Sequence, residues 1–283
     1  MNIFNIIDEI EKVDPEITER LNPRRAAIKN ITSFGSKVAV AALPFALGTM
    51  LKRAYGAAST TDVVGVLNFA LTLEYLEAAF YNQGFASTGL IPSGNSDYIG
   101  VIRRDENAHV KFLQNVITSL NATPVQASTY DFTGGNNKGN GPFKDVFTNY
   151  ATFLAVAQVF EDTGVRAYKG QAPVLLGNQT VLTAALSIHA VEARHASAIR
   201  KLRRDLNQAP NNKPYIVSSA SLGNDTGLSL VDANYAGEEN VTQGGVNLVT
   251  ALNVSTEAAS AAFDEPLTKD QVTSLVVGSF IVQ

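Results

Sequence analysis

The sequence predicts an all-α protein whose central part is a four-helix bundle with one long crossover connection. Four long segments between residues 61 and 206 carry apolar residues at three- and four-residue steps, which is the period of an amphipathic helix. The three connections between these segments are short, long and short, as in a bundle whose middle connection crosses from one end to the other. One set of Glu, Tyr and His residues also occurs twice, once in each half of this region.

The first two helices are predicted at about residues 61–83 and 96–120. In each helix, acidic residues fall on the same stripe as the apolar residues that would face the core. The connection between them, residues 84–95, contains Pro92 and is short. The two helices are therefore expected to be antiparallel neighbours.

A second pair of helices is predicted at about residues 143–169 and 179–206. The short loop between them contains Pro173, so this pair repeats the first hairpin. The crossover between the two hairpins, residues 121–142, is rich in Gly and Asn. The bundle is accordingly assigned to residues 57–207.

Residues 1–56 are assigned to an N-terminal helical leader. They contain the basic pair Arg24-Arg25, followed by an apolar run from Val38 to Leu51. This run of 14 residues is too short to span a bilayer, so no transmembrane segment is predicted. The run resembles the hydrophobic region of a twin-arginine export signal, and the alternative is a helix pair that packs on the bundle. The protein is therefore expected either in the cytoplasm or, if the leader directs export, in the periplasm.

Residues 208–283 are predicted to form a C-terminal extension that packs on the bundle. Within it, residues 211–255 are rich in Asn, Gly, Ser, Thr and Val, with brief alternation at 228–231. This composition favours mostly irregular structure with short strands. A final helix capped by Thr268 is predicted within residues 263–283.

The composition of the 283 residues limits the kinds of function that the chain can have. A net charge of −4 gives no electrostatic reason to expect nucleic acid as a partner. The absence of Cys excludes disulfides, thiolate metal sites and iron–sulfur clusters. A metal in this protein must therefore be held by oxygen and imidazole donors, which suit Fe, Mn or Zn.

Two sets of side chains repeat along the chain at a nearly constant offset. In each set a Tyr follows the first Glu by seven residues, and a His follows the second Glu by three. The first Glu residues of the two sets are 87 positions apart, and the second Glu residues are 86 apart. The sets are Glu74, Tyr81, Glu106 and His109, and then Glu161, Tyr168, Glu192 and His195. Four carboxylates and two imidazoles on four helices are the ligands of a carboxylate-bridged two-metal site.

The positions of these residues on their helices favour metal binding. Each of the four Glu residues lies on an apolar stripe, where an ionised carboxylate costs several kcal/mol unless a cation or hydrogen bonds compensate for the lost water. Glu and His three residues apart project from one helix face, so both can hold the same ion. The alternative is a metal-free network of hydrogen-bonded Glu and His. It is less favoured because half-satisfied buried networks are unstable.

The repeat also separates two acidic candidates in the first helix. Glu74 corresponds to Glu161, whereas Glu77 corresponds to Gly164, so Glu74 is assigned as the ligand. Glu77 is assigned to the surroundings of the site or to the surface.

The two repeated tyrosines, Tyr81 and Tyr168, are predicted to donate hydrogen bonds to carboxylates across the bundle. The alternative role is that of aromatic core residues with the hydroxyl at the edge. His189 lies three residues before Glu192 and is treated either as an extra ligand or, in preference, as a hydrogen-bonded histidine at the end of the bundle.

Other charged residues near the two sets are assigned outside the ligand positions. Asp105 and Asp162 point about 100° away from the ligands and are predicted to be solvated or to contact them indirectly. A group of arginines in the second and fourth helices is predicted to lie mostly on solvated faces: Arg103, Arg104, Arg194, Arg200, Arg203 and Arg204.

At these positions the chain resembles the ferritin-like superfamily of two-metal carboxylate proteins, and more narrowly the bacterial ferritin-like domain proteins with an N-terminal leader. The resemblance is carried by LNFALTLEYLEAAFY at 67–81, DENAH at 105–109, FEDTGVRAY at 160–168 and HAVEARH at 189–195. It implies a site for two Fe ions or, alternatively, two Mn ions. The ligands that it implies are Glu74, Glu106, His109, Glu161, Glu192 and His195.

Two functions from different classes are expected of such a chain. The first is a metal-dependent oxidoreductase or iron-binding protein, ferroxidase-like or peroxide-consuming, whose partners are metal ions with dioxygen or peroxide. The second is a structural or assembly protein that uses the bundle as a scaffold, with metal absent or only structural. In either case the leader or the extension is expected to provide the contacts of a homo-oligomer.

Overall fold

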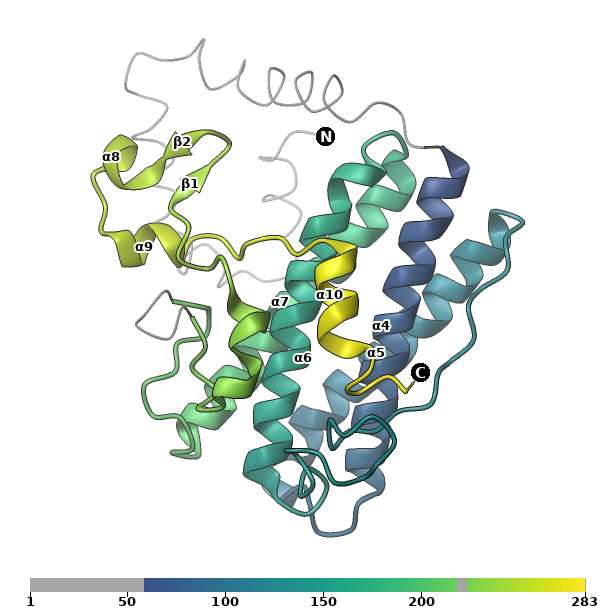
Figure 1. Ribbon diagram of the computed structural model, residues 1–283, viewed down its shortest axis with the longest axis vertical. Coiled ribbons are helices and arrows are strands. Elements are labelled where there is room, and N and C mark those ends of the chain that lie inside the picture. The colour runs from purple at the N-terminus through teal and green to yellow at the C-terminus, as the bar shows by residue number, and fades with distance from the viewer. Residues whose placement is uncertain (1–58, 218–222, 283) are drawn as a thin grey trace, which may run out of the picture. The chain divides into compact units, whose positions relative to one another are not determined.

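The computed structural model of the chain describes residues 59–217 and 223–282 (Figure 1). The expectations for residues 1–56, namely the helical leader and the twin-arginine-like motif, lie outside the described residues.

Four long helices form the bundle, which confirms the predicted all-α fold class. The helices are α4 (Thr60–Ala86), α5 (Ser93–Ser119), α6 (Tyr150–Gln171) and α7 (Gln179–Asp205). α4 packs mainly on α5 and α6 mainly on α7, and α4 also contacts α6 (Figure 1). The connection from α5 to α6, residues 120–149, is the long crossover, whereas a single 3₁₀ turn, η1 (Ala172–Leu175), lies between α6 and α7.

Side chains cap three of the four bundle helices at their first turn. Ser59 and Asp62 form a reciprocal capping box at the start of α4. The side chains of Asn149 and Asn178 accept hydrogen bonds from backbone N–H groups in the first turns of α6 and α7. Each cap satisfies donors that a helix N-terminus otherwise leaves unpaired.

The predicted start of the third helix at about residue 143 is wrong by seven residues, because α6 begins at Tyr150. The Asn149 side chain fixes this start by capping the helix. Phe143 and Val146 are buried in turns before the helix, so their spacing resembles a helical stripe although their backbone is not helical.

α4 is long and apolar enough to cross a membrane by length and composition alone. In the described structure, 61% of its most apolar window is buried. Two acidic side chains of the helix, Glu74 and Glu77, are buried as well. Burial of the apolar window and of two acidic side chains is expected of the core helix of a bundle. Such a helix can have the same length and apolar composition as a membrane span.

The C-terminal extension contains short elements, as the sequence predicts, and its helices are brief. They are η2 (Ser229–Tyr235), β1 (Thr242–Gln243), β2 (Val246–Asn247), α8 (Leu248–Leu252), α9 (Thr256–Ser260) and α10 (Lys269–Val276). The two strands pair antiparallel. The alternation at 228–231 belongs to the start of η2 and not to a strand. Thr268 caps α10 as predicted, but the helix ends at Val276, well before residue 283.

The extension is attached to α6 by a buried arginine. Arg166 has no exposed surface and donates hydrogen bonds to the backbone carbonyls of Asn234, Ala236 and Glu265. Its Nε also lies 2.8 Å from the carboxylate of Glu238, which is buried too. One side chain of the bundle thus holds three separate backbone positions of the extension.

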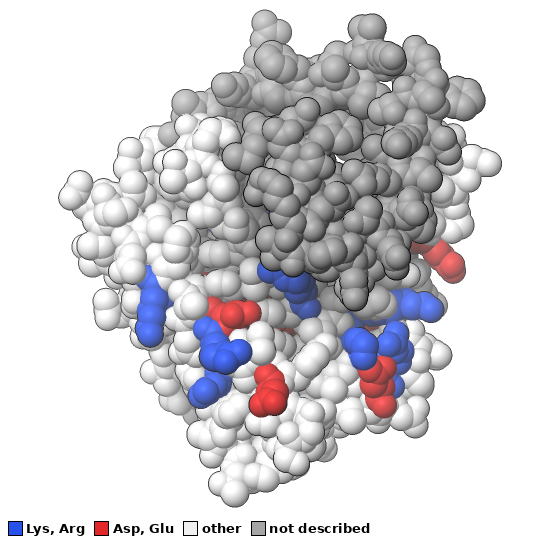
Figure 2. Space-filling model, turned by 180° about the vertical axis from the view of Figure 1, so that it is seen from behind, with Lys and Arg blue, Asp and Glu red and all other residues white. Residues whose placement is uncertain are grey.

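The prediction that the arginines of the fourth helix are solvated is wrong for Arg200 and Arg203, which are 0% and 3% exposed. Arg200 pairs with both carboxylate oxygens of Asp162 and with Asp225. Arg203 donates to the carbonyl oxygen of Thr226 at 2.9 Å. Residues of the extension cover this face of α6 and α7, so charges that the helix pattern places in water are buried. On the face shown in Figure 2, by contrast, the visible charged side chains of both signs are interspersed.

Candidate metal centre

Six side chains that the sequence singles out meet between the four bundle helices. α4 and α6 provide one carboxylate each, while α5 and α7 provide a Glu and a His each from successive turns. All of them are buried: Glu74, Glu106, His109, Glu161, Glu192 and His195. They form two groups whose ligand atoms lie within 4.8 Å of one another, each of which can hold a metal ion.

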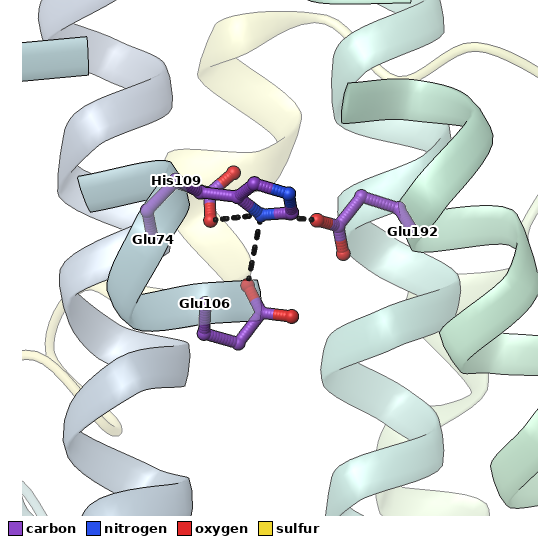
Figure 3. A group of neighbouring side chains, drawn as sticks. All are labelled: Glu74, Glu106, His109 and Glu192. Atoms are coloured by element: carbon purple, nitrogen blue, oxygen red, sulfur yellow. Dashed lines mark hydrogen bonds and ion pairs between the residues drawn. The ribbon is translucent and has the colours of Figure 1, made fainter. Parts of the chain in front are cut away.

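The first group surrounds the Nδ1 atom of His109. This nitrogen lies 3.1 Å from Glu74, 3.3 Å from Glu106 and 3.2 Å from Glu192. Figure 3 shows the three carboxylates approaching the same edge of the imidazole ring from α4, α5 and α7. Three carboxylate oxygens and one ring nitrogen converge on a common point.

The second group surrounds the Nδ1 atom of His195 in the same way. This nitrogen lies 2.7 Å from Glu106 and 3.4 Å from Glu161, and Glu192 completes the group. Glu106 and Glu192 therefore belong to both groups, whereas Glu74 and Glu161 belong to one group each. Glu106, for example, directs Oε2 to His109 and Oε1 to His195.

Several polar atoms of this centre are buried without a hydrogen bond in the described structure. They are Oε1 of Glu106, Oε2 of Glu161, both carboxylate oxygens of Glu192 and Nδ1 of His195. Some lie close to one another, as Glu106 and His195 do, but not in the orientation of a hydrogen bond. Buried polar groups are nearly always paired, so orphaned atoms that face a shared centre fit cations that would satisfy them.

Two tyrosines orient the outer carboxylates of the centre from the opposite hairpin. Tyr81 of α4 donates to Oε1 of Glu161 on α6, and Tyr168 of α6 donates to Oε1 of Glu74 on α4, both at 2.5 Å. The two bonds are reciprocal, as the repeat predicts. The second oxygen of each carboxylate faces a histidine: Oε2 of Glu74 faces His109, and Oε2 of Glu161 faces His195.

The Tyr81 hydroxyl offers a test of this orientation. Tyr81→Phe is expected to weaken metal binding by about 10- to 100-fold, because Glu161 loses the hydroxyl that fixes its carboxylate and can turn away from the ion. Competition with a chelator measures the change. Tyr75→Phe is the matched control, since the Tyr75 hydroxyl lies on the same helix but contacts Gln114. Equal affinities for both variants would show that the Tyr81 hydrogen bond does not position a ligand.

Burial and the repulsion between neighbouring carboxylates raise the pKa values of Glu106 and Glu192. Burial raises the pKa of Glu106 to about 7, although the neighbouring imidazoles of His109 and His195 lower it. The pKa of Glu192 is raised well above its ordinary value by burial and by the charges of Glu106 and Glu74. Without cations, the centre therefore binds protons that carboxylates in water would release.

The pKa values of the two histidines are also raised, but by the neighbouring carboxylates and against the effect of burial. Burial lowers the pKa of His195, but the neighbouring Glu161 and Glu106 outweigh burial and raise it to about 12. The pKa of His109 is likewise raised by the neighbouring carboxylates of Glu106, Glu192 and Glu74, against the effect of burial. A cation at each Nδ1 would take the place of the proton that the carboxylates attract.

Glu77 lies inside the centre, so its assignment to the surface as one alternative is wrong. It is only 4% exposed, and burial together with the charge of Glu192 raises its pKa well above the ordinary value. Space for the buried Glu77 side chain is provided by Gly164, its counterpart in the repeat. A Cβ atom at Gly164 would lie 3.2 Å from Glu77 and 3.3 Å from Glu192, so the glycine leaves room for both carboxylates.

Asp105 and His189 are two further polar residues that the sequence places near the centre. Asp105 is 43% exposed and lies 3.2 Å from Nε2 of His195, on the side of the ring opposite to the carboxylates. This contact fixes the ring and directs Nδ1 inward. Neither of the two described groups that can hold an ion includes His189.

Apolar residues close the centre at both ends along the bundle. One core cluster contains Phe80 and Phe153, whose rings stack 4.7 Å apart, and includes Tyr81. The other contains Leu71 and includes Tyr168. The six polar side chains therefore lie between two apolar layers that separate them from water.

Comparison with known proteins bears on the same residues. A family model described as a ferritin-like domain matches residues 62–205, which is 144 of the 283 residues and just over half of the chain. The matched range contains both groups of Glu and His and both tyrosines. Comparison with curated proteins gave no match.

Proposed function

This chain belongs to the ferritin-like domain family, and from that membership and the two Glu/His groups we propose that it oxidises Fe(II) with dioxygen at a di-iron centre. The proposed ligands are the six residues of the two groups, and two Mn ions are the alternative occupants. The observation that supports the proposal most directly is the sharing of Glu106 and Glu192, because two carboxylates common to both groups can bridge a pair of ions.

The charge and chemistry of the donors fit two divalent cations. Four carboxylates neutralise the charge of two such ions, and the donors are oxygen and imidazole only, which suits Fe and Mn. When bound, two Fe(II) ions supply the two electrons that, with two protons, convert one dioxygen molecule into hydrogen peroxide and leave two Fe(III) ions.

The residues of the chain have separate tasks in this proposal. Glu74 and Glu161, each oriented by a tyrosine hydroxyl, would hold one ion each, while Glu106 and Glu192 would hold both. The apolar clusters at both ends exclude water from the centre. Because the pKa of Glu106 lies near 7 without metal, this residue can exchange a proton when ions bind or leave.

The proposal is tested by metal titration followed by an oxidation assay. The full chain is expected to bind two Fe(II) per chain without oxygen, and then to consume about one dioxygen per two Fe(II) as the peroxide forms. Peroxide disproportionation by the Mn-loaded protein, without Fe(II) oxidation, would favour the dimanganese alternative. A folded protein that binds neither Fe nor Mn would overturn the proposal and favour the scaffold function.

The pH dependence of stability gives an independent test. The metal-free protein is expected to lose stability as the pH rises from about 5 to 8. The pKa of Glu106 and that of Glu238 are raised by burial to about 7, so the folded chain keeps protons that the unfolded chain has already released in this range. With excess Mn(II) the trend should reverse, because ions bind the deprotonated ligands. Thermal unfolding with a chelator and with Mn(II) measures both slopes. A melting temperature in chelator that rises over this range would contradict the prediction.

A further inference from the structure

An apolar cavity of about 20 Å³ lies at the end of the bundle where α4 begins and α5 ends. All four bundle helices contribute to its wall, with residues such as Leu67, Leu113, Ala167 and Ala185. Apart from Tyr168 and Gln171, every residue that lines the cavity is aliphatic or a phenylalanine.

The cavity lies directly beside the metal centre. Its wall includes Leu73, which precedes Glu74 in the chain, and Leu113, which lies one helical turn beyond His109. It also includes Tyr168, whose hydroxyl is already bonded to Glu74. The cavity therefore approaches the half of the centre that Glu74 and His109 form.

The size and lining of the cavity determine what can enter it. A volume of this size accommodates one water-sized molecule, but a stable water needs about two to four hydrogen-bond partners. The Tyr168 hydroxyl is occupied by Glu74, and Gln171 is partly exposed at the edge, so the interior offers no such set of partners. Apolar cavities of this kind stay dry and take up apolar ligands such as xenon.

We propose that this cavity admits dioxygen to the ion held by Glu74 and His109. Dioxygen is small and apolar and forms no obligatory hydrogen bonds, whereas hydrogen peroxide carries two O–H donors that would be unpaired in the cavity. The inference rests on the proposed function, because it identifies the route of that reaction's oxidant. It assigns dioxygen in preference to peroxide as the molecule that reaches the centre from this side.

Gas binding to the metal-free full chain tests the cavity separately from the proposed function. Under xenon or oxygen pressure, the methyl NMR signals of Leu67, Leu113 and Ile188 are expected to shift or broaden. The signals of Leu154 and Ile216, which belong to the other core cluster, should not respond. Unchanged signals at the three cavity methyls would overturn the proposal, whatever the metal content of the protein.

Filling the cavity tests its role in the reaction. Ala185→Leu should abolish the xenon response and slow Fe(II) oxidation by dioxygen by about tenfold, with Fe(II) binding and oxidation by added hydrogen peroxide unchanged. Ala190→Leu is the matched control, since Ala190 is exposed on the same helix and does not line the cavity. Ala70→Val fills the cavity from α4 and serves as a second variant if Ala185→Leu does not fold. Equal slowing with dioxygen and peroxide, or full activity without xenon binding, would contradict the proposed route.

Discussion

Replacing both Glu106 and Glu192 by alanine is expected to abolish the binding of both metal ions. These two residues belong to both groups of ligands, so their loss removes half of the carboxylates and every bridge between the ions. Glu74→Ala, by contrast, removes a ligand of one group only and should leave one ion bound. Elemental analysis after reconstitution and gel filtration measures the stoichiometry.

Substitution of Glu106 and Glu192 should not destabilise the metal-free protein, although it abolishes metal binding. The double Gln variant of Glu106 and Glu192 is expected to be as stable as the metal-free wild type or up to about 3 kcal/mol more stable, because buried like charges are removed without loss of volume. Urea unfolding in chelator measures this difference. Glu257→Gln provides a control, since Glu257 is exposed on α9. Two ions still bound to the double Ala variant, or marked destabilisation of the double Gln variant, would show that these residues are structural.

Replacing Arg166 by methionine is expected to destabilise the protein by about 3–5 kcal/mol, because Glu238 is left as a buried carboxylate without its cation. Three backbone carbonyls of the extension also lose their donor. Burial already raises the pKa of Glu238 to about 7, and the guanidinium opposes that rise. The loss should therefore be larger at pH 8 than at about pH 5.5, where Glu238 is protonated in either protein.

Denaturant unfolding of Arg166→Met at both pH values tests this expectation. The double variant Arg166→Met/Glu238→Gln should regain part of the stability, since the unpaired charge is then absent. Arg204→Met is the control: Arg204 pairs with Asp205 at a partly exposed position, and such pairs contribute less than about 1 kcal/mol. A loss for Arg166→Met no greater than that of the control would show that the extension is held by other contacts.

The sequence predicts that the six side chains of the centre meet, and the structure brings them together, because the relationship between them is local. A Glu and a His three residues apart share a helix face in any amphipathic helix, and the repeat specifies which Glu of the first helix is equivalent to Glu161. The tyrosine contacts follow from the same symmetry. The repeat even explains Glu77, whose counterpart Gly164 provides the space for its side chain, but only the structure shows that this space is filled.

The features that the sequence did not predict depend on distant parts of the chain. Arg200 and Arg203 have the pattern of a solvated helix face, and they are buried because residues near Asp225 fold over them. The predicted start of α6 lies too early in the chain, because buried apolar residues in turns can have helical spacing by coincidence. Neither the burial of these arginines nor the start of α6 can be predicted from the sequence pattern of one or two helical turns.

The crossed tyrosine contacts and shared carboxylates have an evolutionary consequence. Neither hairpin holds a complete group by itself, since the group at His109 needs Glu192 and the group at His195 needs Glu106. If the repeat arose by duplication, an ancestral half-length peptide could have held its pair of cations only between two associated copies. Fusion of the two copies would have made assembly independent of concentration and freed each half to diverge, as Glu77 and Gly164 have done.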